Sequence, residues 1–260
     1  HLGRPLRRAP PGPEEQALLA AVDRFAAVIA GRVAESEGEG TTLRLAPLAR
    51  RFGLTRAEQD VLVLVLAPEL APRFERIVGY LHDDLTRRRV SVGLVLQVLA
   101  RDDAGAAALR RGLCEAGTLV REGLVRRVEG EAATTSLSAP LRVAQRVVDF
   151  LHGSDALDAR LRGVVRRGGG AVGLGQLVLA PPVRARLEAL RERWRIGEVD
   201  ALYLHGPEGS GRCAAIEAVG GELGLGVLRV ACAALEPGGF AAQVERVRRE
   251  ALLDARVVVW

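Results

Sequence analysis

The residues best placed to do chemistry form a glycine-rich turn in the last quarter of the chain. Residues 201–219 read ALYLHGPEGSGRCAAIEAV, a short apolar stretch followed by a turn and the start of a helix. In this layout successive backbone N–H groups and the positive end of the helix dipole surround a phosphate chain. Nine residues are predicted to contact phosphate: Gly206, Pro207, Glu208, Gly209, Ser210, Gly211, Arg212, Cys213 and Ala214.

Two of these residues depart from the phosphate-binding pattern G-x-x-x-x-G-K-[ST]. Arg212 replaces the lysine, and Cys213 replaces the hydroxyl residue that ligates Mg²⁺. Arginine keeps the charge, but its longer planar fork fits the turn poorly. A thiol is a poor ligand for Mg²⁺, which prefers oxygen. We therefore expect this part of the protein to bind ATP or ADP weakly or not at all and to hydrolyse neither at a useful rate, with no catalytic residue and no metal ligand.

The elements around the turn make the pattern more specific than its spacing alone. The stretch 201–204 has the composition of a strand, and a helix follows the turn. A second strand at 227–230, a helix at 240–253 and a third strand from Val257 come next. This order predicts the beginning of a doubly wound parallel sheet, with phosphate at the carboxyl end of its first strand. A parallel sheet that does not begin at Tyr203 would contradict this interpretation, and glycines that merely make a tight turn remain the alternative.

The preceding residues predict a helical domain with a small ribbon. Apolar periodicity predicts helices at 14–38, 43–52, 56–70, 72–81, 91–99 and 104–123. Thr55 and Glu58 form a capping box, and Ser91 begins a later helix. Residues 124–128 alternate like a strand that residues 134–138 could pair with, and helices are expected at 141–151 and after Ser154 and Asp155. Helices followed by a two-stranded ribbon indicate a winged helix.

The predicted fold is an α domain followed by an α/β domain, in four parts. Residues 1–40 are a lead and a helix, and residues 41–162 are the helical, winged-helix domain. Residues 163–180 are a glycine-rich linker, and residues 181–260 are the first half of a phosphate-binding αβα domain that opens with a helix at 183–194.

The charge of the chain does not by itself indicate nucleic acid. All 37 basic residues are arginines, with a net charge of +5, as expected from a GC-rich coding sequence. Arg126, Arg127, Arg142 and Arg146 could touch DNA phosphates, but a solvated surface is the favoured interpretation. We expect the three cysteines to be buried and no metal site to exist, because their spacing fits neither zinc nor a disulfide framework. No segment has the length or composition to span a membrane, so we expect a cytoplasmic protein.

With these motifs in view, the chain resembles AAA+ ATPases. Residues 206–211 resemble their Walker A segment, G-P-x-G-[ST]-G-K-[ST], and residues 228–234 resemble their second strand. Residues 257–259 resemble the Walker B strand, whose acidic pair would follow Trp260. Residues 49–70 and 83–89 resemble the helical, winged-helix region at the front of bacterial AAA-family ATPases that occur with contractile injection systems.

The resemblance implies that this chain is the N-terminal piece of a longer bacterial enzyme with two ATPase modules. In such proteins the first module often has an altered Walker A segment, while the second hydrolyses ATP with Mg²⁺. The implied partners are a protein substrate or a homo-oligomeric ring that remodels or assembles it. Two alternatives stay open: a winged-helix DNA-binding regulator with an ATPase-like switch domain, and a non-catalytic structural module.

Overall fold

The structure is a computed structural model that describes residues 12–41, 43–128, 135–168, 173–199, 201–207 and 209–260. The chain divides into two compact units, His1–Pro47 and Leu48–Trp260. Within the described ranges no helix combines the length and the apolar character that a membrane crossing requires.

The first unit consists mainly of one long helix, as its periodicity predicts. Helix α1 runs over Pro13–Gly38, begins with proline in its first turn and ends before Gly40, which has a φ of +80°. Its large apolar side chains lie on the surface: Leu18, Leu19, Val22, Phe25, Val28, Ile29 and Val33.

The second unit opens with helices at the predicted places, except that the stretch 104–123 forms two helices separated by a turn instead of one. Capping residues explain where two of the helices begin. Thr55 accepts a hydrogen bond from the Glu58 backbone N–H at 3.3 Å, and the Glu58 carboxylate accepts one from the Thr55 N–H at 2.9 Å. Ser91 caps the next-but-one helix by accepting from the Leu94 N–H at 3.1 Å. The helices are α2 (Leu45–Phe52, which straddles the boundary of the units), α3 (Arg56–Leu70), α4 (Pro72–Leu81), α5 (Val92–Leu99), α6 (Asp103–Gly112), α7 (Thr118–Arg121) and α8 (Gln145–Leu151).

A two-stranded ribbon lies among these helices, but its second strand is not where the sequence predicts it. Strand β1 (Val125–Arg127) pairs antiparallel with β2 (Leu141–Val143). The predicted return strand at 134–138 is wrong, since residues 135–138 form a turn and residue 134 lies outside the described ranges. Leu141 and Val143 are buried while Arg142 points outward, so this alternation makes a strand where a helix was expected. The helix starts only at Gln145.

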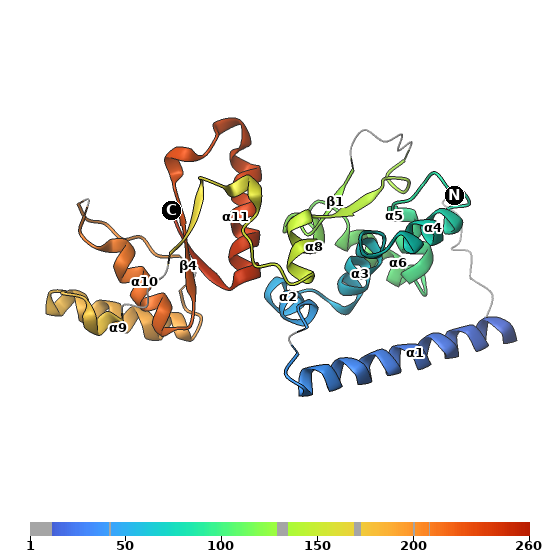
Figure 1. The fold of residues 1–260 in the computed structure, drawn as a ribbon, viewed down its shortest axis with the longest axis horizontal. Coiled ribbons are helices and arrows are strands. Elements are labelled where there is room, and N and C mark those ends of the chain that lie inside the picture. Colours follow the sequence, from blue (N-terminus) through green and yellow to red (C-terminus); the bar gives the residue numbers. More distant parts are fainter. Residues whose placement is uncertain (1–11, 42, 129–134, 169–172, 200, 208) are drawn as a thin grey trace. The chain divides into compact units, whose positions relative to one another are not determined.

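A three-stranded sheet with helices on both faces follows. Its strands are β3 (Val165–Gly168), β4 (Gly226–Val230) and β5 (Arg256–Val259), in the order β3-β4-β5. Strands β4 and β5 are parallel and are joined through helix α11 (Phe240–Asp254). Leu228 and Val230 pack with α11, whereas Val227 lies under helix α10 (Arg212–Glu222). The helix-strand-helix-strand order predicted after the glycine-rich turn is thus confirmed (Figure 1).

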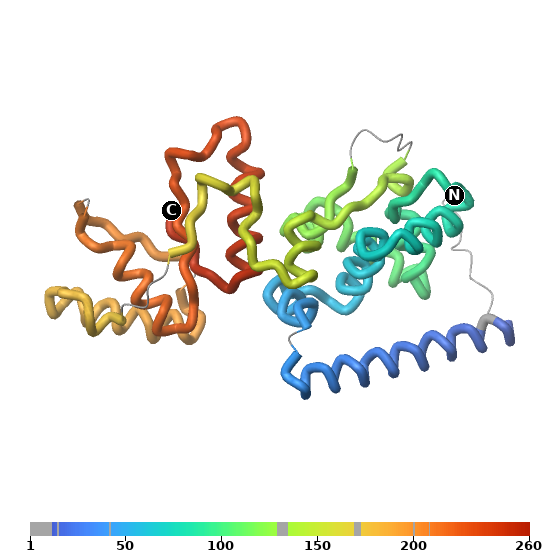
Figure 2. The backbone as a smooth tube through the Cα atoms, in the orientation of Figure 1, coloured from blue at the N-terminus to red at the C-terminus, as the bar shows by residue number. Residues whose placement is uncertain are grey.

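The first strand of the predicted parallel sheet is absent. Residues 201–207 belong to no strand, so the described sheet does not begin at Tyr203, which contradicts the prediction that this segment opens a doubly wound parallel sheet. A strand exists only by hydrogen bonding to a neighbour, and no strand in the described part of the chain pairs with this segment. The edge next to β4 is occupied instead by β3, which is antiparallel and comes from the stretch expected to be a loose linker (Figure 2).

The segment between the ribbon and the glycine-rich turn contains further short elements. Instead of a helix capped by Ser154 and Asp155, a 3-10 turn forms over Ala159–Leu161, capped by Asp158. A second 3-10 turn covers Leu174–Gln176. Helix α9 (Pro181–Arg195) forms as predicted and packs on α10 through a cluster that includes Leu187 and Val219.

Candidate functional site

The glycine-rich turn has a backbone conformation that its glycines make accessible. Gly209 and Gly211 have φ values of +79° and +78°, in the left-handed region that other residues rarely adopt. Gly211 is the N-cap residue of α10, and the helix begins at Arg212. Left-handed residues beside right-handed ones turn consecutive N–H groups toward a common concave side, which is how backbone nests hold anions.

The turn is also closed on itself. The Ser210 N–H donates to the Pro207 carbonyl at 3.2 Å. A Cβ at Gly206 would lie 2.8 Å from the Ser210 hydroxyl oxygen, so this position accepts only glycine without a shift. Of the nine predicted contact residues, Gly206, Pro207, Gly209, Ser210 and Gly211 lie in this loop, Arg212, Cys213 and Ala214 form the first turn of α10, and Glu208 lies outside the described ranges.

The first turn of α10 is open to an anion. Among the described residues no side chain caps its amides, and Gly209, Ser210 and Gly211 are exposed. The N-terminus of an 11-residue helix carries a partial positive charge that favours a bound anion. Arg212 and Cys213 are both exposed, at the start of the helix.

The cysteines differ from expectation. All three were predicted to be small buried residues, but Cys114, Cys213 and Cys232 are exposed free thiols. Cys213 is exposed because it occupies the first turn of a helix that buries only its later residues, from Ala215 onward. In the described residues no group of three His, Cys, Asp or Glu side chains could hold a metal ion.

The four arginines considered for DNA contact are bound within the protein. Arg126 pairs with Glu245 at 2.6 Å, and Arg142 pairs with Glu69 at 3.5 Å. Arg127 donates to the Leu113 carbonyl at 3.1 Å. The fourth, Arg146, is 3% exposed and pairs with Glu250 at 2.7 Å. These side chains do not form a free cationic surface in this conformation.

Comparison with known families identifies the helical part of the chain. The family model of the winged helix domain, variant, matches residues 6–165, more than half of the sequence. The chain belongs to this family. Residues 48–151, with α3 to α8 and the β1–β2 ribbon, are called the winged-helix region below, and residues 161–260 the sheet region. No curated protein and no solved structure matches the chain.

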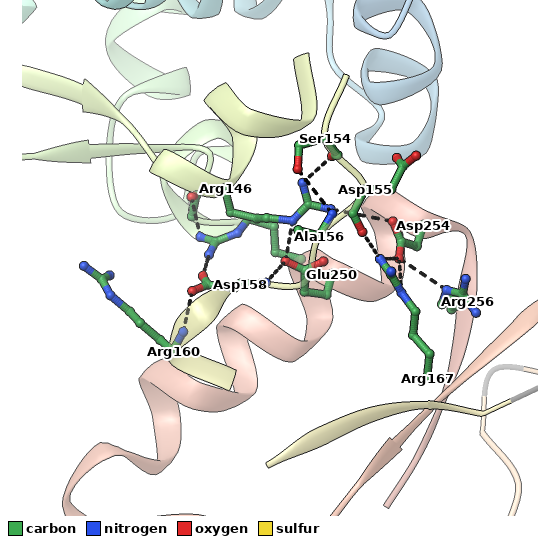
Figure 3. A network of polar contacts seen from close by, with 12 residues as sticks. Arg146, Ser154, Asp155, Ala156, Asp158, Arg160, Arg167, Glu250, Asp254 and Arg256 are labelled. Carbon is green, nitrogen blue, oxygen red and sulfur yellow. Dashed lines mark hydrogen bonds and ion pairs between the residues drawn. The ribbon is translucent and has the colours of Figure 1, made fainter. Parts of the chain in front are cut away.

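A buried network of charges joins these two regions, and sequence analysis did not find it. The Arg146 guanidinium, from α8, donates to Glu250 Oε1 at 2.7 Å and to the Ser154 carbonyl at 3.1 Å. The Asp158 backbone N–H donates to the same carboxylate oxygen at 3.0 Å. Figure 3 shows Arg146 and Glu250 facing each other from the two regions.

Three further ion pairs extend the contact along α11. Arg249 donates to Asp158 Oδ2 and to the Gly123 carbonyl, both at 2.9 Å. Nearer the surface are the Arg126–Glu245 pair and a contact between Arg248 and Glu122 at 3.0 Å. We call the set Arg126, Arg146, Asp158, Glu245, Arg249 and Glu250 the charged seam.

Burial shifts the ionisation of the two most enclosed groups of the seam. Loss of hydration raises the pKa of Glu250 above its usual value, although the hydrogen bond from Arg146 opposes the shift. Loss of hydration likewise lowers the pKa of Arg249, although Asp158 opposes it. Both shifts mean that enclosure disfavours the charged forms.

Proposed function

We propose that the loop at residues 206–213 binds the phosphate groups of a nucleotide, ATP or ADP, in a winged-helix protein. The observation that carries the proposal is the pair of left-handed glycines, Gly209 and Gly211, directly before an uncapped helix N-terminus. Backbone amides in this arrangement recognise a phosphate without regard to the side chains.

The proposal extends to the resemblance with AAA+ ATPases. On this interpretation the chain is the front part of an enzyme that remodels or assembles a protein partner, and this module binds nucleotide without hydrolysing it. Support comes from the parallel pair of β4 and β5, with α10 and α11 on opposite faces. The missing strand at 201–204 counts against it, so the loop and α10 carry the argument rather than the sheet.

A glycine substitution with a matched control tests the phosphate site. An alanine at Gly211, whose φ is +78°, would be strained by about 1–2 kcal/mol and would turn the amides of the loop. Gly224, at the other end of α10, has a φ of +71° and no described atom within 4 Å of a Cβ, as at Gly211. We expect similar losses of stability in Gly211→Ala and Gly224→Ala, but a loss of ADP binding only in the first.

The outcome separates the proposal from a non-catalytic structural module. Equal ADP binding by both variants, measured by isothermal titration, would show that the loop only makes a turn. The missing strand and the replacements at Arg212 and Cys213 favour that second candidate.

A DNA-binding regulator is the third candidate, and membership of the winged-helix family favours it. The seam opposes it, because Arg126 and Arg146 are paired with carboxylates of α11. Salt-dependent binding of a DNA duplex by the whole chain would support this candidate.

A further inference from the structure

Helix α11 has two faces of different chemistry. Toward the sheet it presents Val247 and Ala251, which pack in an apolar cluster with Leu228 and Val230. Toward the winged-helix region it presents the acidic and basic residues of the charged seam. An apolar contact is lost when water enters, whereas charged groups regain hydration when they separate. Separating α11 from the sheet is therefore expected to cost more free energy than separating α11 from the winged-helix region.

We propose that the charged seam is a reversible latch, which holds the winged-helix region against α11 and releases it without unfolding either region. The inference does not depend on nucleotide binding. In the released state α11 stays on the sheet through its apolar face, and Arg126, Arg146, Glu245 and Glu250 become hydrated. Asp158 caps the 3-10 turn that packs on α11, so its pair with Arg249 stays on the sheet side.

The hydrogen bonding of the seam supports release. In the described residues four buried side-chain atoms have no hydrogen-bond partner, and three of them belong to the seam: Arg146 Nη2, Arg249 Nε and Glu250 Oε2. Arg146 Nη2 has only an ion-pair contact with Asp254 at 3.7 Å. A buried charge with an unmet hydrogen bond costs free energy that water recovers on opening. Polar contacts between regions of one chain are typical of interfaces that open and close.

The covalent connection allows the movement. Between the end of α8 at Leu151 and the 3-10 turn at Ala159, the chain contains neither helix nor strand. Gly153 lies in this connection with a φ of +97°, and a Cβ there would meet no described atom within 4 Å. A few residues of this kind are enough to absorb the change in φ and ψ of a hinge.

The latch would act on the end of the sheet. Helix α11 is followed by β5 after one left-handed residue, Ala255, and Val258 of β5 packs with Val247 and Ala251 of α11, so we expect the helix and the strand to move together. The closed latch also keeps Arg126 and Arg146 paired with carboxylates. Opening would release both arginines and free α11 from the winged-helix region.

The exposed cysteines provide the experiment. Spin labels on Cys114, in the winged-helix region, and Cys232, in the sheet region, report the distance between the two regions after Cys213→Ser removes the third thiol. The whole chain is measured in about 0.1 M and about 1 M NaCl, where the Debye length falls from about 10 Å to about 3 Å. The higher salt weakens the partly exposed Arg126–Glu245 pair, while the buried Arg146–Glu250 pair is screened much less. At low salt we expect one narrow distance between the labels. At high salt we expect a second, longer distance whose population increases, while the helix signal in circular dichroism stays constant.

A charge reversal gives an independent measurement. Glu245→Arg places a cation opposite Arg126, and we expect it to raise the fraction with the longer distance at least about tenfold, because like charges in contact repel each other. Glu192→Arg makes the same change on α9, where Glu192 pairs with Arg195, and should leave the distance distribution unchanged. If Glu245→Arg fails to fold, the salt series alone decides. A single distance at both salt concentrations, or a longer distance that appears only as helix signal is lost, would overturn the latch.

Discussion

The pair formed by Arg146 and Glu250 allows a quantitative test of the charged seam. Their side chains are 3% and 0% exposed. While the seam is closed, Glu250→Leu leaves the Arg146 charge buried, with the Ser154 carbonyl and the ion-pair contact to Asp254 as its remaining partners. Removing one member of a buried pair costs about 3–5 kcal/mol, and the Asp254 contact places this case near the lower value.

The double variant Arg146→Met with Glu250→Leu should be less harmful than the single one. It leaves no buried charge of the pair, and apolar replacement of a buried pair is often neutral. Two backbone groups lose a partner, the Asp158 N–H and the Ser154 carbonyl, at about 1 kcal/mol each. We therefore expect a loss of about 0–2 kcal/mol, which is at least about 1 kcal/mol less than in Glu250→Leu alone.

Urea denaturation followed by circular dichroism measures both losses. With a slope of about 2 kcal/mol per molar urea, the single variant should unfold about 1.5 M earlier than the unchanged chain, and the double variant less than about 1 M earlier. A single variant as stable as the double would show that Arg146 does not depend on Glu250. Arg146 and Glu250 would then not form a buried ion pair on which the stability of the seam depends.

Three further predictions concern other parts of the chain. Gly123→Ala and Gly163→Ala should each cost about 1–2 kcal/mol in urea denaturation, because both positions have a left-handed φ. Gly123→Ala should cost up to about 1 kcal/mol more, because its Cβ would push the Glu245 carboxylate away from Arg126; equal losses would contradict the close approach. All three cysteines should react with a thiol reagent in the native protein, because all are exposed. Saturating ATP should slow the reaction of Cys213 alone; if ATP slows none of the three reactions, the nucleotide does not bind at the loop. Arg142→Ala should leave binding to a DNA duplex, measured by fluorescence anisotropy, unchanged within about twofold, because Arg142 is paired within the protein; a tenfold loss would favour the regulator.

The helices were predictable because their signals are local. The capping box at Thr55 and Glu58 places the start of α3, and Ser91 places the start of α5. Each signal lies within four residues of the backbone group that it satisfies, so one sequence contains all the information. The helix, strand, helix and strand after the glycine-rich turn were predictable for the same reason, since each has a clear apolar pattern.

The strands that failed depend on distant partners. Residues 201–204 have the apolar composition of a strand but have no pairing strand in the described chain. Val165 and its neighbours do pair, with β4 about 60 residues away along the chain. The many glycines in residues 163–180 led to the prediction of a linker, so strand β3 was missed. Strand β2 could have been found from the alternation of Leu141, Arg142 and Val143, which the helical interpretation overlooked.

The charged seam could not have been predicted from the sequence. Arg146 and Glu250 are separated by 104 residues, and the chain contains 37 arginines that offer many equivalent partners. The one local signal was a pair of adjacent charges, Arg249 and Glu250, between the buried Val247 and Leu253 of α11. Charged residues within an apolar helical pattern indicate buried partners, but not which ones.

Isothermal titration of the whole chain with ADP and ATP tests the central claim most directly. The account predicts weak binding that changes little with Mg²⁺, because Cys213 is a poor ligand for the ion. Arg212→Lys with Cys213→Thr should raise the affinity for Mg²⁺-ATP at least about tenfold, or about 1.4 kcal/mol. No binding by either protein would contradict a phosphate site at residues 206–213.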